Sequence, residues 1–476
     1  MSKRLTVVLA LTFWLVYLFH FNPAGSGSGR FTYLTMALAE RGTVDVTPYH
    51  ALEPVDIMPF KARYYINTNP GTSFLAAPAW AVFYAGYRFL PAHWPIRSLP
   101  FHIFLAHLVG YAATTALLSA LTAIMIARFV YKRSAATWRA VFAALLYAFG
   151  TTSFFLSTRL NQNVVITFLS LAIFLLVFEP AVVGVADDRM RAILIGLAAG
   201  LGILVDLSIV PFLLAMAIPI FRVVHDGRGL SRTLVSALAP IACLMLYQWQ
   251  AFRNPLLPAQ WYLTDFLGPA PPNPLALLDH LILPSRGLFV YMPFTALSLW
   301  YLARRRSTEA SNLSRQERMY IWTLFGVYLL YVSVVQSSVF SGYGPRYLLP
   351  VLPYLCIVLG LYLRRREETA AIVLVGVSFF VQLVGAQCGR DTRNMFFEIS
   401  LWMIRGPWLP VVDWLHGNTF IAGRLLRTAS HGAASPAGLL VMLGWCLLML
   451  WSPCLLNWIR DKQRPDSPGS EYSGVR

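Results

Sequence analysis

The sequence predicts an all-α integral membrane protein with about twelve transmembrane helices. Of its 476 residues, 57% are hydrophobic and only 12% are charged, and the mean hydropathy is +0.59. A soluble globular protein carries about 25% charged residues. Many apolar runs approach the ~20 residues that a helix needs to cross a bilayer. The net charge of +17 falls in short clusters beside these runs, a distribution that is typical of membrane proteins and argues against nucleic-acid binding.

The first apolar run, 5–21, follows Lys3 and Arg4 and has no signal-peptidase site after it, so we expect a retained anchor. The other expected spans are 71–90, 101–127, 137–157, 164–185, 192–221, 233–252, 287–303, 320–340, 347–363, 370–388 and 434–459. An even number of spans keeps both termini cytoplasmic. The basic clusters at 304–306, 364–366 and 460–464 then lie inside, as the positive-inside rule expects.

One basic cluster disagrees with this alternation. Arg128, Lys132, Arg133 and Arg139 would lie on the outer face. Either a helix between 71 and 170 is miscounted, or the positive-inside rule yields locally.

The long polar segments fall on the predicted outer face. They are the loops 22–70, 253–286 and 389–433, joined there by the turn 341–346. We expect residues 1–460 to form one transmembrane domain whose large first loop contains short amphipathic helices. Residues 461–476 are expected to be a polar cytoplasmic tail.

The cysteines indicate no disulfide framework and no metal site. The five cysteines lie in or at the end of apolar runs, without a CxxC or Cys/His ligand spacing. We therefore expect neither a metal nor another cofactor.

The first outer loop gathers most of the charged residues in the first part of the chain. Asp45 and Asp56 are carboxylates that could act as a general base at the membrane surface, and Lys61 and Arg63 are cations that could hold an anion. Each of them could equally be a solvated charge on an interfacial helix.

The segment SGYGPRYLLP (341–350) predicts a tight turn followed by a helix. Pro345 suits the first helical position, which places Arg346 at the helix start and Tyr343 in the turn. An arginine at the outer end of a span opposes the positive-inside bias, so we expect it to bind an anion; snorkelling to the interface is the alternative.

Two further candidates have weaker signals. Asp206 lies within the apolar run 192–221, where an acid would be a proton relay or a helix-fastening group. Arg390 lies in the last outer loop, close to tryptophans that suit either a sugar or an interfacial belt.

Several segments, taken in order, resemble the bacterial GT-C-type membrane glycosyltransferases, relatives of protein mannosyltransferases and of the lipid A aminoarabinose transferase. They are the anchor run, the long first loop, YYINTNPGTSFLAAP (64–78), the NPL…PSRGLFVYMPF stretch ending at residue 294, and YGPRYLLPVLP (343–353). The likeness covers about residues 5–363. It implies a multi-pass protein of the bacterial plasma membrane, surrounded by membrane lipids, that transfers a sugar on the outer face. The donor would be a polyprenyl-phosphate sugar, and the acceptor a lipid, glycan or protein.

The resemblance also implies a catalytic acid just before an Arg-Tyr or similar pair in the first loop. Here that place reads GSGSGRF (25–31) and has no acid. Relatives often have Lys where this chain has Thr68-Asn69, and Gln-His where it has Gln162-Asn163. We therefore predict that another acid of the loop supplies the base. The predicted roles are Asp56, then Asp45, for the base; Arg346, Lys61 and Arg63 for the phosphate; and Tyr343 and Arg390 for donor or acceptor contacts.

Two other classes of function stay open on sequence alone. A transporter or flippase of a lipid-linked substrate would centre on Asp206. A non-catalytic scaffold with the same fold would follow from the missing first-loop acid.

Overall fold

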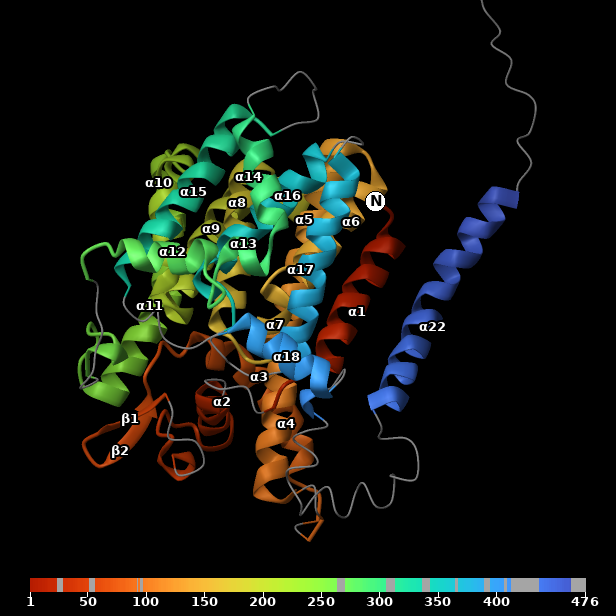
Figure 1. Ribbon diagram of the computed structural model, residues 1–476. Coiled ribbons are helices and arrows are strands. Elements are labelled where there is room, and N and C mark those ends of the chain that lie inside the picture. Colours follow the sequence, from red (N-terminus) through yellow and green to blue (C-terminus); the bar gives the residue numbers. More distant parts are fainter. Residues whose placement is uncertain are drawn as a thin grey trace, which may run out of the picture.

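The chain is a helical bundle with a small mixed layer at one end (Figure 1). The computed structural model describes residues 1–23, 29–50, 56–91, 93–94, 97–262, 270–304, 313–335, 343–363, 367–388, 394–405, 409–411 and 436–463. The bundle elements are α1 (Lys3–Phe19), α4 (Leu99–Tyr111), η3 (Ala112–Ala116), α5 (Leu117–Ser134), α6 (Thr137–Gly150), α7 (Ser153–Leu156), α8 (Gln162–Phe178), η4 (Pro180–Val183), α9 (Asp188–Val205), η5 (Leu207–Ile209), α10 (Val210–Val223), α11 (Gly227–Phe252), α13 (Leu288–Tyr291), α14 (Phe294–Ala303), α15 (Arg315–Val334), η8 (Arg346–Val351), α16 (Leu352–Tyr362), α17 (Glu368–Cys388) and α22 (Pro436–Gln463).

The predicted predominance of helices is confirmed. Among the described residues, three helical stretches are long and apolar enough to cross a membrane: Leu99–Ser134, Gly227–Phe252 and Glu368–Cys388. Shorter apolar helices of 10–17 residues fill most of the rest of the bundle. The exposed side chains of these helices include many large apolar ones, for example Leu214 at 70% and Ile372 at 70% exposure, a surface that suits lipid rather than water. The number of twelve spans stays a prediction.

Polar side chains begin the helices at both ends of the bundle. Asp187 and Asp226 accept backbone N–H groups at the starts of α9 and α11, and Asn161 does so for α8. Ser314 and Glu317 form a reciprocal capping box at the start of α15. These caps satisfy N–H groups that would otherwise have no partner in an apolar environment.

The first outer loop folds into a layer against one end of the bundle. Its elements are α2 (Gly29–Arg41), η1 (Thr47–Tyr49), β1 (Ile57–Phe60), β2 (Arg63–Ile66) and α3 (Gly71–Tyr87). The two strands pair antiparallel with Ile57 opposite Ile66 and Phe60 opposite Arg63. The loop thus contains a β-hairpin in addition to the short helices that the sequence predicted.

The three predicted outer loops meet at this end. Phe60 of β1 lies with its ring centroid 5.2 Å from that of Tyr262 in η6 (Ala259–Tyr262). The backbone N–H of Met395, at the start of α18 (Met395–Arg405), donates to the Pro284 carbonyl at 3.2 Å. Pro284 follows α12 (Pro274–Ile282), so segments far apart in the sequence cover one end of the bundle (Figure 1).

The expected span 71–90 does not run to the opposite end of the bundle. The His107 ring of α4 lies 4.9 Å from the ring of Phe21, at the outer end of α1, and His102 binds Glu40 of α2 at 2.9 Å. The first half of α4 therefore lies beyond the end of α1, and α3 stays with it in the outer layer (Figure 1). Apolar composition alone did not distinguish this outer helix from a membrane span.

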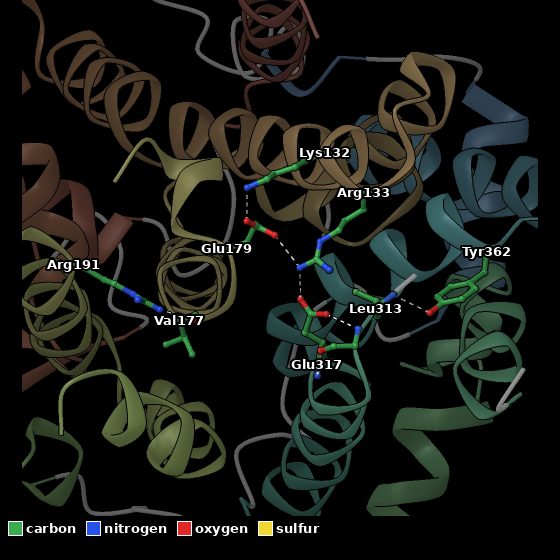
Figure 2. Close-up of polar contacts among 9 residues, drawn as sticks. Lys132, Arg133, Val177, Glu179, Arg191, Leu313, Glu317 and Tyr362 are labelled. Carbon is green, nitrogen blue, oxygen red and sulfur yellow. Dashed lines mark hydrogen bonds and ion pairs between the residues drawn. The ribbon is translucent and has the colours of Figure 1, made fainter. Parts of the chain in front are cut away.

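The basic cluster that disagreed with the alternation lies at the other end of the bundle. Arg133 binds Glu179 at 2.9 Å and Glu317 at 2.8 Å, and Lys132 also binds Glu179 (Figure 2). Glu317 is in the first turn of α15, next to Arg315 and on the predicted inner side. These contacts favour a miscounted helix between 71 and 170 over a local failure of the positive-inside rule, while the side of the membrane stays a prediction.

Arginines also bind the ends of helices here. Arg191 donates to the carbonyls of Leu176 and Val177 at 2.6 Å each, and Arg139 donates to that of Leu361 at 2.6 Å. These guanidinium groups satisfy C-terminal carbonyls of α8 and α16 and complement the helix dipoles. The inner end is thus fastened by ion pairs and by helix capping (Figure 2).

The expected single span 192–221 is two helices. α9 ends at Val205, Asp206 adopts an extended conformation, and η5 and α10 follow. Asp206 lies within the apolar run as expected, but at a helix break, which corrects the expectation of one continuous span over 192–221.

Cysteine labelling tests the corrected topology. We expect His93→Cys to react with an impermeant maleimide from the same side as Lys61→Cys, and Thr137→Cys only from the opposite side, in a background without the native cysteines. The predicted alternation gives the reverse assignment for both positions. Labelling of Thr137→Cys together with Lys61→Cys in sealed vesicles would therefore contradict the topology described here.

The buried member of the inner ion cluster should matter most for stability. The side chain of Glu317 is 2% exposed, whereas that of Lys132 is 45% exposed. We expect Glu317→Gln, which keeps the capping box, to lower the free energy of unfolding by about 1–3 kcal/mol, because Arg133 loses the more deeply buried of its two carboxylate partners. Lys132→Ala should cost about 1 kcal/mol or less. Equal losses in a denaturant titration of the two variants would contradict this ranking.

Candidate functional site

The carboxylate of Asp56 meets an arginine at the start of α2. Asp56 precedes β1, and its Oδ2 lies 2.6 Å from Nη1 of Arg30. Asn67, directly after β2, donates its side-chain N–H to Oδ1 of Asp56 at 3.2 Å and its backbone N–H to the Asp56 carbonyl at 3.1 Å. The open end of the hairpin thus presents Asp56 to the bundle.

Arg30 is the arginine of GSGSGRF, the place where the resemblance implies an acid before an Arg-Tyr or similar pair. Residues 24–28 lie outside the described part of the chain. The Arg30 side chain is 12% exposed and stacks on Phe31 with its guanidinium 4.7 Å from the ring centroid. A carboxylate from further along the loop therefore lies next to the arginine of this motif.

Polar contacts continue from Arg30 into the bundle. Nη2 of Arg30 lies 3.4 Å from Oε1 of Gln162, the first residue of α8, and Nε2 of Gln162 lies 3.5 Å from Oδ2 of Asp206. Asp206 also accepts the backbone N–H of Ser208 at 2.8 Å. Asp56 and Asp206 are thus joined by one arginine and one amide.

Gly71 is required where α3 begins. A Cβ atom at this position would lie 2.6 Å from the backbone of Val205, so α3 starts directly against the helix break at Asp206. The Asn69 side chain donates to the Ile203 carbonyl at 2.8 Å and fixes the same approach. The close neighbour of the Pro70-Gly71 turn is therefore the end of α9.

Two arginines lie nearby, one at the start of η8 and one in the segment between α12 and α13. Arg346 begins η8, as the sequence predicted, and is half-buried; its Nη2 lies 3.2 Å from the Tyr347 hydroxyl. Arg286 is 4% exposed and lies 3.8 Å from Asp279 of α12. The ring centroid of Tyr331 in α15 lies 6.1 Å from that of Tyr347, and the hydroxyl of Tyr328, one turn earlier, donates to the Ser208 carbonyl at 3.1 Å. One face of α15 therefore contacts both the start of η8 and the helix break at Asp206.

His280 of α12 is enclosed by these charges. It is 1% exposed, and its Nδ1 donates to the Ala276 carbonyl at 2.8 Å. Burial lowers the pKa of His280 from its ordinary value of 6.5, and the positive charges of Arg286 and Arg346 act in the same direction; the bond to Ala276 and the charge of Asp279 oppose them and are outweighed. At neutral pH the imidazole is therefore uncharged.

The structure does not bring the other first-loop candidates to Asp56. Asp45 accepts the N–H and hydroxyl of Thr47 and lies 3.8 Å from Arg63, so it caps the turn before η1. Lys61 and Arg63 lie at the hairpin turn, at the far end of the strands from Asp56. With a rise of about 3.3 Å per residue, the five residues from Asp56 to Lys61 span roughly 16 Å.

The remaining two candidates do not join the group. Tyr343 is 0% exposed; its hydroxyl donates to the Val381 carbonyl, and its ring packs against Tyr291 and Phe155. Here the side chain has a packing role, and its expected contact with a ligand stays a prediction. Arg390 lies outside the described residues.

Sequence reasoning missed Arg30 and Gln162 as members of this group. The only signal for Arg30 was its place in the motif of the resemblance, and Gln162 was noted only as a departure from relatives. The described residues contain no group of three or more His, Cys, Asp or Glu side chains placed to hold a metal ion.

A shallow apolar groove of about 440 Å³ follows the seam between α2 and α3. It is lined by Leu38, Ala39, Phe74, Ala77, Pro78 and Ala81. Both helices start close to the polar group, at Arg30 and at Gly71.

No protein-family model and no curated protein sequence matches the chain. Solved structures do. ArnT from Cupriavidus metallidurans in the apo state aligns over 94% of this chain and 75% of its own, with a TM-score of 0.51 and 14% identity. The same protein bound to undecaprenyl phosphate gives 0.48 at 14% identity over the same shares. An apo oligosaccharyltransferase from Archaeoglobus fulgidus gives 0.41 at 13% identity, over 88% of this chain and 59% of its own.

The fold and the polar end define a class of helical protein that presents acids and arginines at one end of an apolar bundle. Within that class, the similarity to apo ArnT shows that this chain has the fold of that protein, which is the GT-C-type fold expected from the sequence. The resemblance seen in the sequence is thus confirmed at the level of the fold.

His280 makes the stability of the protein depend on pH. Its pKa is lower in the folded state than the ordinary value of about 6.5, so the unfolded chain binds more protons between these two values and stability falls as the pH drops below about 6.5. We expect His280→Asn, whose amide can still donate to Ala276, to lose less stability than wild type between pH 7.5 and pH 5 in thermal unfolding. Parallel profiles for the two proteins would contradict a buried, neutral His280.

Proposed function

We propose that this protein is a glycosyltransferase that moves a sugar from a polyprenyl-phosphate donor to a lipid, glycan or protein acceptor on the outer face of the membrane. The GT-C-type fold and the sequence motifs support the class of reaction. The observation that carries the proposal is the ion pair between Asp56 and Arg30. It places a carboxylate beside the motif in which the resemblance implies the catalytic acid.

Asp56 is proposed as the general base. A carboxylate offers about four lone-pair sites, and Arg30 and Asn67 use two of them. Another can accept the proton of an acceptor hydroxyl as its oxygen attacks the anomeric carbon and the bond to the donor phosphate breaks. The contacts with Arg30 and Asn67 hold the carboxylate in one orientation for this transfer.

Arg346 and Arg286 are proposed to receive the departing phosphate. Both are arginines at the predicted outer end, where they oppose the positive-inside bias and where an anion stabilises their charge. Their planar guanidinium groups match phosphate oxygens in geometry. The neutral His280 between them adds no further positive charge at neutral pH.

The proposed orientation follows the basic clusters. Both termini and the Lys132–Arg133 cluster would be cytoplasmic, and the layer with Asp56 would face the exterior of a bacterial plasma membrane. The three loops, which meet at one end, would then supply the acceptor side of the site.

The transporter alternative loses its main support, because Asp206 lies at a capped helix break with Ser208 and Gln162 as partners. The scaffold alternative rested on the missing first-loop acid. Asp56 lies next to Arg30 of the motif in which that acid is expected. We therefore favour the transferase.

Turnover of radiolabelled polyprenyl-phosphate sugars by purified protein in liposomes tests the proposal. We expect Asp56→Asn to lower kcat by about 10²-fold or more while donor binding persists, because a lost general base typically costs 10²–10⁴-fold. Arg346→Ala should raise KM for the donor. Lys61→Ala is the matched control from the same loop and should leave both constants unchanged. Donor binding without turnover by wild type, across the panel, would reject the enzyme and leave a lipid-sugar carrier or scaffold.

A further inference from the structure

We propose that Asp206 is a positioning residue of this site: through the amide of Gln162 it fixes the guanidinium of Arg30, and Arg30 fixes the carboxylate of Asp56. The catalytic part of this inference rests on the proposed function of Asp56, whereas the positioning itself is a property of the fold. No motif of the sequence pairs these residues.

The two oxygens of Asp206 have different partners. Oδ1 accepts the backbone N–H of Ser208 at 2.8 Å and so caps η5, while Oδ2 lies 3.5 Å from Nε2 of Gln162. The first contact holds the carboxylate in place on the bundle. Oδ2 is therefore a hydrogen-bond acceptor in a fixed position, facing Gln162 at the start of α8.

Gln162 fits between its neighbours in one orientation only. Arg30 offers donors and needs an oxygen, whereas the Asp206 carboxylate offers acceptors and needs an N–H group. The amide accordingly places Oε1 towards Arg30 at 3.4 Å and Nε2 towards Asp206 at 3.5 Å. The charge of Asp206 thus decides which atom of Gln162 faces Arg30.

Arg30 links Gln162 to the first loop, so the position of its guanidinium group determines the position of the Asp56 carboxylate. Its Nη1 lies 2.6 Å from Oδ2 of Asp56, from which the β1–β2 hairpin extends. The two Gln162 contacts, at 3.4 and 3.5 Å, exceed the usual hydrogen-bond length of about 2.7–3.2 Å.

Asp206 also faces the basic part of the site. The ring centroid of Tyr331 is 6.1 Å from that of Tyr347, which Arg346 contacts, and the hydroxyl of Tyr328, one turn earlier on α15, donates to the carbonyl of Ser208 next to the break. A carboxylate at the helix break therefore orders the arginine that holds the base and lies near the one proposed to hold the phosphate.

Three variants separate this role from simple packing. Asp206→Asn keeps an N-cap of equal quality for η5. Its amide N–H, however, needs an acceptor, so the Gln162 amide rotates by half a turn and its Nε2 then faces Arg30. Gln162→Glu places two carboxylates face to face. The double variant restores the pattern, because the carboxylate introduced on α8 accepts from both Arg30 and the amide introduced at the helix break. Asp226→Asn, a cap of α11 with Gly229 N–H at 3.1 Å, is the matched control.

We expect each single variant to lower kcat by roughly 10-fold or more with KM for the donor unchanged, since small displacements of a catalytic group have effects of this order. The double variant should recover to within about 3-fold of wild type, a coupling that only linked residues show. An altered KM with unchanged kcat in Asp206→Asn would show that Asp206 binds substrate directly and would overturn the positioning role.

Amide hydrogen exchange of the 57–66 hairpin gives a second readout that needs no activity. The single variants should exchange faster in this hairpin, the double variant should return to the wild-type rate, and Asp226→Asn should match wild type. Unchanged exchange in both single variants, or no recovery in the double variant, would overturn the inference. If wild type shows no turnover but the exchange pattern holds, the proposed function fails and the positioning role stands.

Discussion

The ion pair between Arg30 and Asp56 is the contact on which the proposed site depends. A partly exposed pair of this kind stabilises a protein by about 1 kcal/mol or less, so its main effect here is to specify position. Asp56 has a φ of 65°, a left-handed conformation that aspartate tolerates better than most residues. Together with Asn67, the pair directs one end of a hairpin to the start of α2 and α8.

The two ends of the bundle differ in how their charges are satisfied. At the inner end, Arg133 lies within 3 Å of two glutamates, and arginines bind the C-terminal carbonyls of two helices. At the other end, Arg30 and Asp56 form a direct ion pair, and Asp206 is joined to this pair only through the longer contacts of the Gln162 amide. A rigid bundle that carries adaptable polar groups in its loops is an arrangement that supports binding and catalysis. Because the polar break at Asp206 lies at the outer end, the asymmetry favours chemistry there over passage through the centre.

Local signals in the sequence predicted local structure well. Gly-Pro before Arg346 placed this residue at the start of η8, and the charges of the first loop marked the polar end. The run 192–221 looked continuous because Asp206 is flanked by apolar residues, although an aspartate two positions before Ser208 is a cap signal. The run 71–90 has the composition of a membrane span, and only its packing against α2 and α4 places it in the outer layer. The pairing of Arg30 with Asp56 is a tertiary contact between residues far apart in the sequence. The glycines and serines before Arg30 have no pattern that predicts it.

The choice between the two acids of the first loop shows where sequence reasoning could have gone further. Asp45 precedes Thr47 by two positions, and Asp-x-Thr is a common turn pattern in which the carboxylate accepts the N–H two residues on. The structure shows this contact, at 2.9 Å. Asp56 is followed by Ile57 and Met58 and starts a strand, so a local turn does not occupy its carboxylate in this way. An acid without a local partner is the better candidate for a distant one, and on that argument Asp56 rather than Asp45 is the residue to pair with Arg30.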